Sequence, residues 1–446
     1  MLRKIEKPDI SGVDKERIGA LLEGKNDYVM NLVRRSFAPY SHWEKIKHWS
    51  IPSEAKPLEL WALIKVIRTQ LSERKQSAVK DEQGKNFSWL TWLPGMEEFL
   101  HQVDMKLGGS IFVGQEFGEE LQHRLLSRGI MEEAIASSQL EGAHTSRKAA
   151  KKILLEGKKP KNKDEQMIVN NYKAMRFIED ELKDQKISEE MLLNLHKILI
   201  TNTLDKTEIG RYRKDEDDII VGDDGSRGEI YHIPPKEDFI KKDVKRFIDY
   251  ANDELTDTGF VHPVIKAIII HFWIGYLHPF IDGNGRLARA LFYWYLLRKG
   301  YWLFGYLPLS KVIKNSPAQY RDAYIYTEQD DNDLTYFIDY NIRKIIQAKK
   351  EFETYAERKW KENAKMTKLA RDKYGLNDRQ IQLLRYCYKN KDASASVTTH
   401  MKVNEVSRLT AAKDLKDLET NGFLSSKKIG RMVHYYATDK AMAMFD

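Results

Sequence analysis

The sequence predicts a mainly α-helical protein with one small β-hairpin in its central domain and a winged helix-turn-helix at its C-terminal end. Three observations predict this fold class. Apolar residues recur at helical spacing through most of residues 166–350. Turn residues separate two short β-branched runs between residues 218 and 235. The C-terminal residues follow the order helix, helix, helix, hairpin, which is typical of a winged helix.

The central region supplies most of the predicted helices. Helical spacing covers residues 168–182, 188–199, 239–255, 264–277, 287–297 and 334–348. Residues 219–221 and 230–233 are predicted strands of a hairpin around the turn at 222–225. The first hundred residues hold five of the nine tryptophans among broken helical patterns, so an α-helical N-terminal region with a tryptophan-rich core is expected.

The C-terminal part has a different pattern. A charged helix over residues 351–373 precedes a helix over 377–388. A further helix carries a predicted apolar stripe and ends at the stop signal Asn421-Gly422. Residues 423–426 and 432–436 are predicted strands on either side of a basic turn at 427–431. The predicted stripe consists of Leu409, Ala412, Leu415 and Leu418.

Composition and charge exclude several classes of protein. The 446 residues are too many for one ordinary core, and 42% hydrophobic residues are not typical of a disordered chain. One cysteine, Cys387, excludes an internal disulfide framework and a cysteine-cluster metal site. The longest apolar run, 264–277, is too short to span a membrane, and the charged start does not resemble a signal peptide. A cytoplasmic protein without membrane association is therefore expected.

The most informative segment is the short loop between the two most apolar helices, which ends near Gly285. The first turn of the following helix presents unpaired backbone N–H groups and the positive end of the helix dipole. Glycines at 283 and 285 let a ligand approach this backbone closely. The loop therefore predicts an anion site suited to phosphate.

Side chains around this loop fit the same chemistry. Arg286 and Arg289 can bind phosphate oxygens, and Asp282 can hold a Mg²⁺ that bridges such oxygens. His278 can take a proton from an attacking hydroxyl near neutral pH. Taken singly, such a histidine is more often structural and such arginines more often solvated. Their convergence within twelve residues favours phosphoryl or nucleotidyl transfer.

These residues carry a family resemblance. The run His278-Pro-Phe-x-Asp-Gly-Asn-Gly-Arg-x-x-Arg289 is similar at every fixed position to the Fic signature HPFx[D/E]GNGRxxR. The resemblance extends over about residues 130–350, including the segment 210–213 before the hairpin. It implies transfer of AMP from ATP, the co-substrate, to a Tyr, Thr or Ser hydroxyl of a target protein, with release of pyrophosphate.

The resemblance also implies roles for individual residues. His278 is the expected catalytic base and Asp282 the expected Mg²⁺ ligand, while Phe280 is a core anchor. The hairpin 219–233 resembles the family's flap, on which the target segment docks by strand pairing. The residues expected to bind ATP are Gly283, Asn284, Gly285, Arg286, Leu287, Ala288, Arg289 and, on a less specific match, Tyr320.

A second motif lies upstream of the core. Ser137, Glu141 and Gly142 fit the Fic inhibitory pattern [S/T]xxxE[G/N], in which the glutamate pairs with the arginine needed for the γ-phosphate, here Arg289. The alternative interpretation of the six residues is a helix capping box. In some family members the same glutamate supports removal of AMP, and the sequence leaves this open.

The sequence patterns and the resemblance together divide the chain into a helical N-terminal region (1–125), a Fic core including the inhibitory helix (126–350), a connecting helix (351–375) and a winged helix-turn-helix (376–446). Of the net charge of +8, residues 366–446 carry +6, from 15 Lys and Arg against 9 Asp and Glu. This tail can bind DNA, or it can serve in protein docking or dimerisation.

A homodimer is an expectation from the resemblance. Alternative functions are transfer of UMP, phosphate or phosphocholine, and a DNA-binding regulator whose Fic core senses nucleotide.

Overall fold

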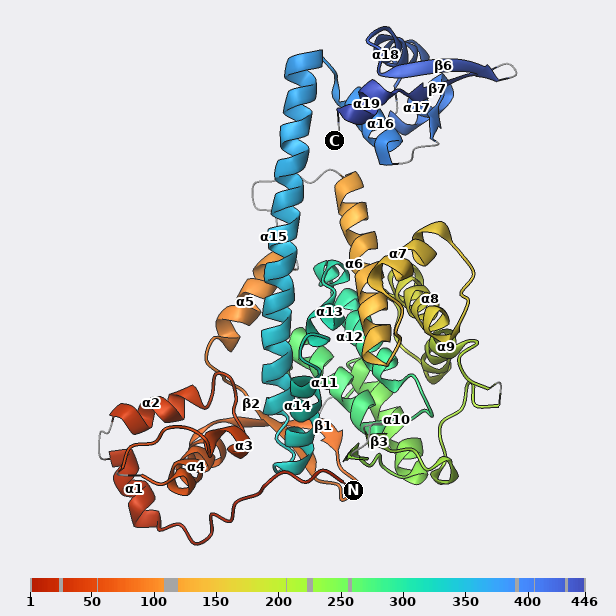
Figure 1. The fold of residues 1–446 in the computed structure, drawn as a ribbon. Coiled ribbons are helices and arrows are strands. Elements are labelled where there is room, and N and C mark those ends of the chain that lie inside the picture. The colour runs from red at the N-terminus through yellow and green to blue at the C-terminus, as the bar shows by residue number, and fades with distance from the viewer. Residues whose placement is uncertain are drawn as a thin grey trace. The chain divides into compact units, whose positions relative to one another are not determined.

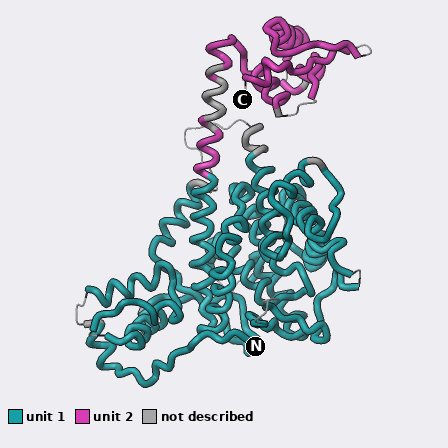
Figure 2. The backbone as a smooth tube through the Cα atoms, viewed as in Figure 1, with its two compact units in different colours: residues 1–352 teal, residues 353–446 magenta. Residues whose placement is uncertain are grey.

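The structure is a computed structural model that describes residues 2–23, 27–53, 55–107, 119–205, 207–222, 228–255, 259–389, 393–404, 406–429 and 432–444. The chain forms two compact units, residues 1–352 and 353–446 (Figure 2). Helices dominate both units, as the sequence predicts, and the sheets are small (Figure 1). Among the described residues, no helix is long and apolar enough to cross a membrane. The four-part division of the chain stays a prediction.

Two adjacent buried helices form the centre of the first unit. They are α11 (Pro263–Leu277) and α12 (Asn284–Arg298), and nearly every side chain of each is buried. A helix that is apolar all round needs neighbours on every side. These neighbours include α6 (Glu119–Leu140), α8 (Lys163–Phe177), α9 (Glu189–Ile200) and α10 (Glu237–Ala251). The loop with the sequence signature therefore joins the two most deeply buried helices.

The remaining elements of the core domain fill in around this pair. They are α7 (Arg147–Glu156), η2 (Ile178–Leu182), η3 (Asp215–Asp217), β3 (Val221–Gly222), β4 (Ile230–His232), η4 (Trp302–Tyr306), α13 (Leu309–Ile313) and α14 (Pro317–Gln329). Strands β3 and β4 pair antiparallel and form the predicted flap hairpin. Residues 223–227 of its turn lie outside the described residues.

The N-terminal region contains a hairpin that the sequence interpretation missed. Helices α1 (Lys15–Glu23), α2 (Asp27–Arg35), α3 (Trp43–Ile46), α4 (Pro57–Val66) and the turn η1 (Ile67–Leu71) precede β1 (Arg74–Lys80), β2 (Asn86–Leu90) and α5 (Met96–Leu107). Arg74 and the Tyr40 hydroxyl both contact Asp333, at 2.7 Å each. These contacts hold the N-terminal region against the start of α15 (Thr335–Tyr374).

Helix α15 corrects one sequence expectation. The patterns at 334–348 and 351–373 were predicted as separate helices, but they form one helix of 40 residues. No glycine or proline occurs within Thr335–Tyr374 to end it. The apolar pattern changes within the helix, while its backbone continues.

The second unit has the element order and sheet pairing expected of a winged helix. Helix α16 (Asp378–Lys389), β5 (Ser394–Ala395), α17 (Val397–Asn404) and α18 (Arg408–Thr420) are followed by β6 (Leu424–Ile429), β7 (Met432–Ala437) and α19 (Asp439–Ala443), with strand order β5-β7-β6. Strand β6 includes Lys427 and Lys428, which the sequence placed in a turn. Gly430 and Arg431 lie outside the described residues.

The predicted stripe on α18 is partly wrong. Leu415 and Leu418 are buried, but Leu409 is 86% exposed. The buried face consists of Ala411, Asp414, Leu415 and Leu418. Leu409 is the second residue of the helix and lies on the opposite face, so a pattern of apolar residues alone assigned it incorrectly.

Candidate active site

The loop between α11 and α12 has a fixed conformation. Helix α11 ends because His278 adopts the left-handed region (φ 44°) and Pro279 follows it. Gly283 also has a positive φ, 87°, at the N-cap of α12. The side chain of Asn284 accepts a hydrogen bond from the Phe280 N–H (2.9 Å) and donates one to the Phe280 carbonyl (2.7 Å). This amide holds the loop closed across the helix start.

His278 lies at the C-terminal end of α11 with a half-buried side chain. Its Nδ1 is 3.3 Å from the Gly275 carbonyl oxygen, which can only accept, so Nδ1 carries the proton and Nε2 has the lone pair. Burial lowers the pKa of His278 to about 4, and the charge of His232 adds to this effect. The imidazole is therefore neutral at pH 7 and able to accept a proton.

Two cationic side chains donate hydrogen bonds to backbone carbonyls at the C-terminal end of α11. Arg213, before the flap, donates from Nε to the His278 carbonyl at 2.7 Å. His232, on β4, has Nε2 2.7 Å from the Tyr276 carbonyl and Nδ1 2.6 Å from the Glu328 carboxylate on α14. Burial would lower the pKa of His232, but Glu328 outweighs it and the pKa is raised. The segment before the flap and the second strand of the flap are thus both bonded to the backbone around His278.

Asp282 and Arg286 form a pair beside α9. Arg286 is fully buried; it donates to the Asp282 carboxylate at 3.0 Å and to the Leu199 carbonyl at 3.0 Å. The Gly283 N–H also donates to this carboxylate, at 2.5 Å. Burial would raise the pKa of Asp282, but Arg286 and this N–H lower it below its ordinary value. Asp282 is therefore ionised at neutral pH.

A second histidine supports the same loop and was missed by the sequence interpretation. His196, on α9, stacks on Phe280 with ring centroids 3.6 Å apart, and its Nε2 donates to the Asp282 carbonyl at 2.9 Å. Burial lowers the pKa of His196 to about 4, so the ring is neutral. Phe280 is buried, as a core anchor requires. Helical spacing places His196 on the apolar face of its helix, but no local pattern links it to residue 282.

Arg289 meets the upstream motif. Its Nη2 donates to the Glu141 carboxylate at 2.8 Å, and its Nε donates to the Ser137 hydroxyl at 2.8 Å. Burial would lower the pKa of Arg289, but Glu141 raises it above its ordinary value. Glu141 directly follows the last residue of α6. The segment therefore ends a helix, and the alternative interpretation as a capping box, which begins one, is wrong.

The Glu141 carboxylate also lies against the start of α12. A Cβ built on Gly285 would be 2.3 Å from Glu141 Oε1 and 3.1 Å from Arg289 Nη1. Only glycine fits here, because any side chain would displace the carboxylate. A negative charge thus lies at the helix N-terminus, where the dipole and Arg289 both favour an anion.

The other predicted ATP-contacting residues divide into two groups. Leu287 and Ala288 are fully buried in α12, so only their backbone is near the helix start. Tyr320, on α14, is half-buried, and its hydroxyl lies 2.7 Å from His271 Nε2. Burial raises the pKa of Tyr320, opposed by Arg289. The structure therefore brings Tyr320 to the Arg289 side of the site.

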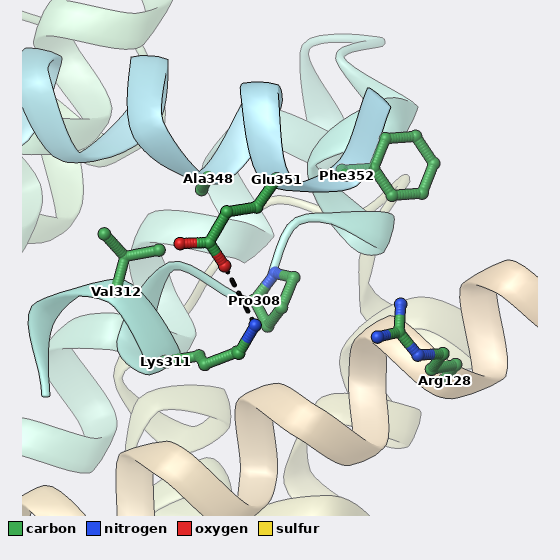
Figure 3. A pocket seen from close by; sticks show the side chains of 7 residues that line it. All are labelled: Arg128, Pro308, Lys311, Val312, Ala348, Glu351 and Phe352. Carbon is green, nitrogen blue, oxygen red and sulfur yellow. Dashed lines mark hydrogen bonds and ion pairs between the residues drawn. The ribbon is translucent and has the colours of Figure 1, made fainter. Parts of the chain in front are cut away.

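A separate small pocket contains none of the predicted site residues. It is lined by Arg128, Pro308, Lys311, Val312, Ala348, Glu351 and Phe352 (Figure 3). Lys311 and Glu351 form an ion pair across it at 2.9 Å. The lining contains no residue of the signature from His278 to Arg289.

Comparisons with known proteins agree with this geometry. Residues 186–296 match the model of the Fic/DOC family. The chain is 27% identical over 212 residues to protein adenylyltransferase fic-1 of Caenorhabditis elegans, covering 45% of this chain and 39% of that protein. It is 33% identical over 129 residues to protein adenylyltransferase Fic of Drosophila willistoni, covering 29% of this chain and 23% of that protein. The matched part thus spans less than half the length of these relatives.

A Fic family protein from Desulfovibrio desulfuricans matches with a TM-score of 0.48 and 21% identity, over 76% of this chain and 96% of that one. Residues 186–296 contain α9, the flap, α11, the signature loop and most of α12. Residues 186–296 therefore match the Fic/DOC family, and the signature of that family is complete from His278 to Arg289.

Proposed function

We propose that this protein transfers AMP from ATP to a Tyr, Thr or Ser hydroxyl of a target protein, and to itself. The observation that carries the proposal is the Glu141 carboxylate at the start of α12, held by Arg289 beside Gly285. A site that binds a carboxylate at a helix N-terminus is suited to phosphate oxygens. The relatives named protein adenylyltransferase support AMP as the transferred group.

The proposed reaction uses the neutral imidazole of His278. The target hydroxyl oxygen attacks the α-phosphorus of ATP while its proton passes to His278 Nε2. A new P–O bond forms to the target, the bond to the oxygen that bridges the α- and β-phosphates breaks, and pyrophosphate leaves with that electron pair. The Gly275 carbonyl keeps the other ring nitrogen protonated, which holds Nε2 available. Backbone N–H groups at 283–285 favour the charge that develops on the α-phosphate.

A divalent metal ion belongs to the proposal, with Asp282 as its protein ligand. Mg²⁺ typically takes one or two carboxylates together with phosphates and waters. Asp282 fits, since it is ionised and its carboxylate is 33% exposed. The described residues contain no cluster of three or more His, Cys, Asp or Glu that could hold a metal without the nucleotide. When bound with ATP, Mg²⁺ would neutralise phosphate charge.

Autoinhibition by Glu141 is the regulatory part of the proposal. Its carboxylate occupies Arg289, the arginine expected to hold the γ-phosphate, and repels the triphosphate. Ser137 adds two contacts to the same guanidinium, through its hydroxyl at 2.8 Å and its carbonyl at 3.1 Å. The arginine is therefore fully engaged by the end of α6 before any nucleotide arrives.

Labelling with radioactive ATP tests catalysis and autoinhibition together. We expect Glu141→Gly to raise AMP incorporation on the order of 10- to 100-fold, the range of a typical coupling between sites. The matched variant Glu141→Gln keeps the shape and removes the charge, so it should raise incorporation less. Adding His278→Ala to Glu141→Gly should remove the signal. Unchanged labelling in Glu141→Gly contradicts autoinhibition, and labelling that survives His278→Ala contradicts the role of the base.

A second proposal concerns the C-terminal unit as a DNA-binding module. Asp414 lowers the predicted charge of α18 in the sequence, but in the structure it is 3% exposed and points inward. It accepts from Arg379 at 2.7 Å and Asn377 at 2.8 Å, and lies 3.2 Å from His400. Asp417 and Glu419 are partly exposed on the same helix, and Glu419 pairs with Lys416 at 3.1 Å. Among the described residues, the unpaired basic charge of this face is carried by the exposed side chains of Arg408, Lys413, Lys427 and Lys428. A recognition helix next to a basic hairpin favours duplex DNA.

Mobility shifts of the full chain on duplex DNA over a salt series test this second proposal. We expect binding that weakens with salt and falls on the order of tenfold in the Arg408→Glu, Lys413→Glu double variant. Lys368→Glu, an exposed lysine outside this face, is the control. Absence of salt-dependent binding would exclude the DNA role, and self-association through the exposed Leu409 would point to protein docking. We also propose that the protein forms a homodimer and is located in the cytoplasm.

A further inference from the structure

The outer edge of flap strand β4 is already paired with this chain's own N-terminal residues. Leu2 forms a parallel bridge with Ile230, and the Arg3 N–H donates to the Ile230 carbonyl at 2.7 Å. Figure 1 places the N-terminus next to the flap. We call residues 2–5 the strap. It adds a short third strand to the two-stranded flap, which is the geometry of β-augmentation.

Gln329, the last residue of helix α14, binds the backbone of the strap. The Gln329 side chain donates to the Arg3 carbonyl at 2.8 Å and accepts from the Ile5 N–H at 3.0 Å. One amide thus binds the backbone of two alternate residues, as a neighbouring strand would. The Arg3 guanidinium lies 3.4 Å from the Asp322 carboxylate, and Ile5 is 8% exposed. Most of this recognition depends on an extended backbone, and the ion pair adds a preference for a basic residue.

The edge that the strap covers belongs to the flap strand that is hydrogen-bonded to the backbone two residues before the candidate base. The His232 side chain, two residues after Ile230, contacts the carbonyl of Tyr276, two residues before His278. A target segment paired with β4 would therefore be positioned by the same strand that positions the base. The strap offers no acceptor, because residues 2–10 contain no Ser, Thr or Tyr.

We propose that the strap is a tethered pseudosubstrate: it occupies the β4 edge on which an extended target segment docks, and the target must displace it. The inference rests on the proposed adenylylation for its consequence, but the binding site itself is independent of chemistry. The partner that fits the site is an extended segment with a basic residue opposite Asp322 and a hydroxyl residue nearby. The occupied edge then restrains target access, as Glu141 restrains ATP.

Peptide binding tests the site without any catalytic step. The probe is a fluorescent peptide of residues 2–9, added to the full chain and followed by anisotropy. We expect the Arg3→Glu chain, whose own strap loses its ion pair with Asp322, to bind the peptide on the order of tenfold more tightly than the natural chain does. Lys7→Glu, with the same charge change outside the strap, is the control. Adding Gln329→Leu to Arg3→Glu should abolish binding, because both backbone contacts are lost.

A hydroxyl placed on the strap tests its alignment with the active site. In a Glu141→Gly chain, we expect Lys4→Tyr, at an exposed strap position, to gain an AMP adduct on residue 4, located by tandem mass spectrometry. Equal peptide affinity in the natural chain, Arg3→Glu and the Gln329→Leu double variant would overturn the proposal. The expected order of affinities with no AMP transfer by any variant would support the strap and fault the proposed function.

Discussion

The pKa of His278 depends partly on charged residues of three other segments, namely Glu141, Arg213 and His232. Burial and the charge of His232 lower its pKa to about 4, while the Gly275 carbonyl and Glu141 act in the opposite direction and Arg213 adds to the lowering. His232 has this charge because Glu328 raises its pKa. The pair His232–Glu328 therefore keeps His278 neutral while it bonds the flap to α11. Neither residue belongs to the sequence signature.

This arrangement predicts the pH dependence of AMP transfer. A base with a lowered pKa is competent above that pKa, so kcat/KM of the Glu141→Gly variant should fall only as pH approaches about 4. Replacing Glu328 by Gln removes the group that raises the pKa of His232, so His232 carries less positive charge in the pH range in which His278 titrates. The pKa of His278 should then rise, and the acid limb should move up by about 0.5–1 pH unit.

Glu190→Gln, an exposed carboxylate on α9, is the matched control and should leave the profile unchanged. An acid limb with its midpoint at the ordinary histidine pKa, about 6.5, in every variant would contradict this account of His278.

Among single residues, the sequence identified those whose role depends on local order. His278, Asp282, Gly285 and Arg289 could be identified because a helix end, a tight loop and a helix start follow one another along the chain. Spacing alone does not indicate that Arg286 donates to the Asp282 carboxylate and to the Leu199 carbonyl. His196 and Glu328 were missed because their contacts cross 86 and 96 residues.

Among the elements, α6 is the one that brings the Glu141 carboxylate to Arg289. Its Gly129 packs so closely that an added Cβ would be 2.6 Å from the Gly305 carbonyl oxygen and 2.7 Å from the Tyr306 Cα. Both atoms are backbone, so they cannot rotate away. The position of α6, and with it Glu141, depends on a glycine outside both motifs.

This packing predicts the effect of one methyl group. Gly129→Ala should destabilise the fold by about 1–3 kcal/mol and, by displacing α6, raise AMP incorporation above that of the natural chain. Gly19→Ala, in helix α1 with nothing within 4 Å of its added Cβ, should be neutral or stabilise by about 0.4–1 kcal/mol. Thermal and urea unfolding followed by tryptophan fluorescence compares the two. Equal stability of both variants would contradict the close packing of α6.

Sequence patterns predicted the positions of some elements and missed others. Helices α9, α11 and α12 match their predicted positions within a few residues, because they are long, apolar and bounded by caps or loop residues. Hairpin β1–β2 was missed, although Gly84 in the turn after Asp81 and the alternation of Phe87 and Trp89 with polar residues could have indicated it. Strand β5 has two residues and gives no periodic signal.

For the whole molecule, the net charge of +8 bears differently on the candidate nucleotide site and on the C-terminal unit. The site that binds an anion depends on Arg289 and a helix N-terminus, so it owes little to net charge. The charge of the C-terminal unit lies on exposed side chains of α18 and β6, while Asp414 is withdrawn inside. Composition alone could not distinguish these cases, because the contacts that bury Asp414 join α16, α17 and α18.

The proposed restraint of activity also depends on contacts that cross most of the chain. Glu141 reaches Arg289 across 148 residues, and the strap reaches Gln329 across more than 320. Each contact covers a different part of the proposed site, one on the nucleotide side and one on the target side. Motifs in the sequence indicate the first of these contacts, and only the folded chain reveals the second.

The most direct test of the central claim is the intact mass of the Glu141→Gly chain after incubation with ATP and Mg²⁺. The account predicts a mass increase equal to one or more AMP groups, each added with loss of water. The Glu141→Gly, His278→Ala chain, checked by circular dichroism to be folded, should show none. An adduct of a different mass, or the same adduct on both chains, would contradict the claim that the chain transfers AMP with His278 as the base and Glu141 as the restraint.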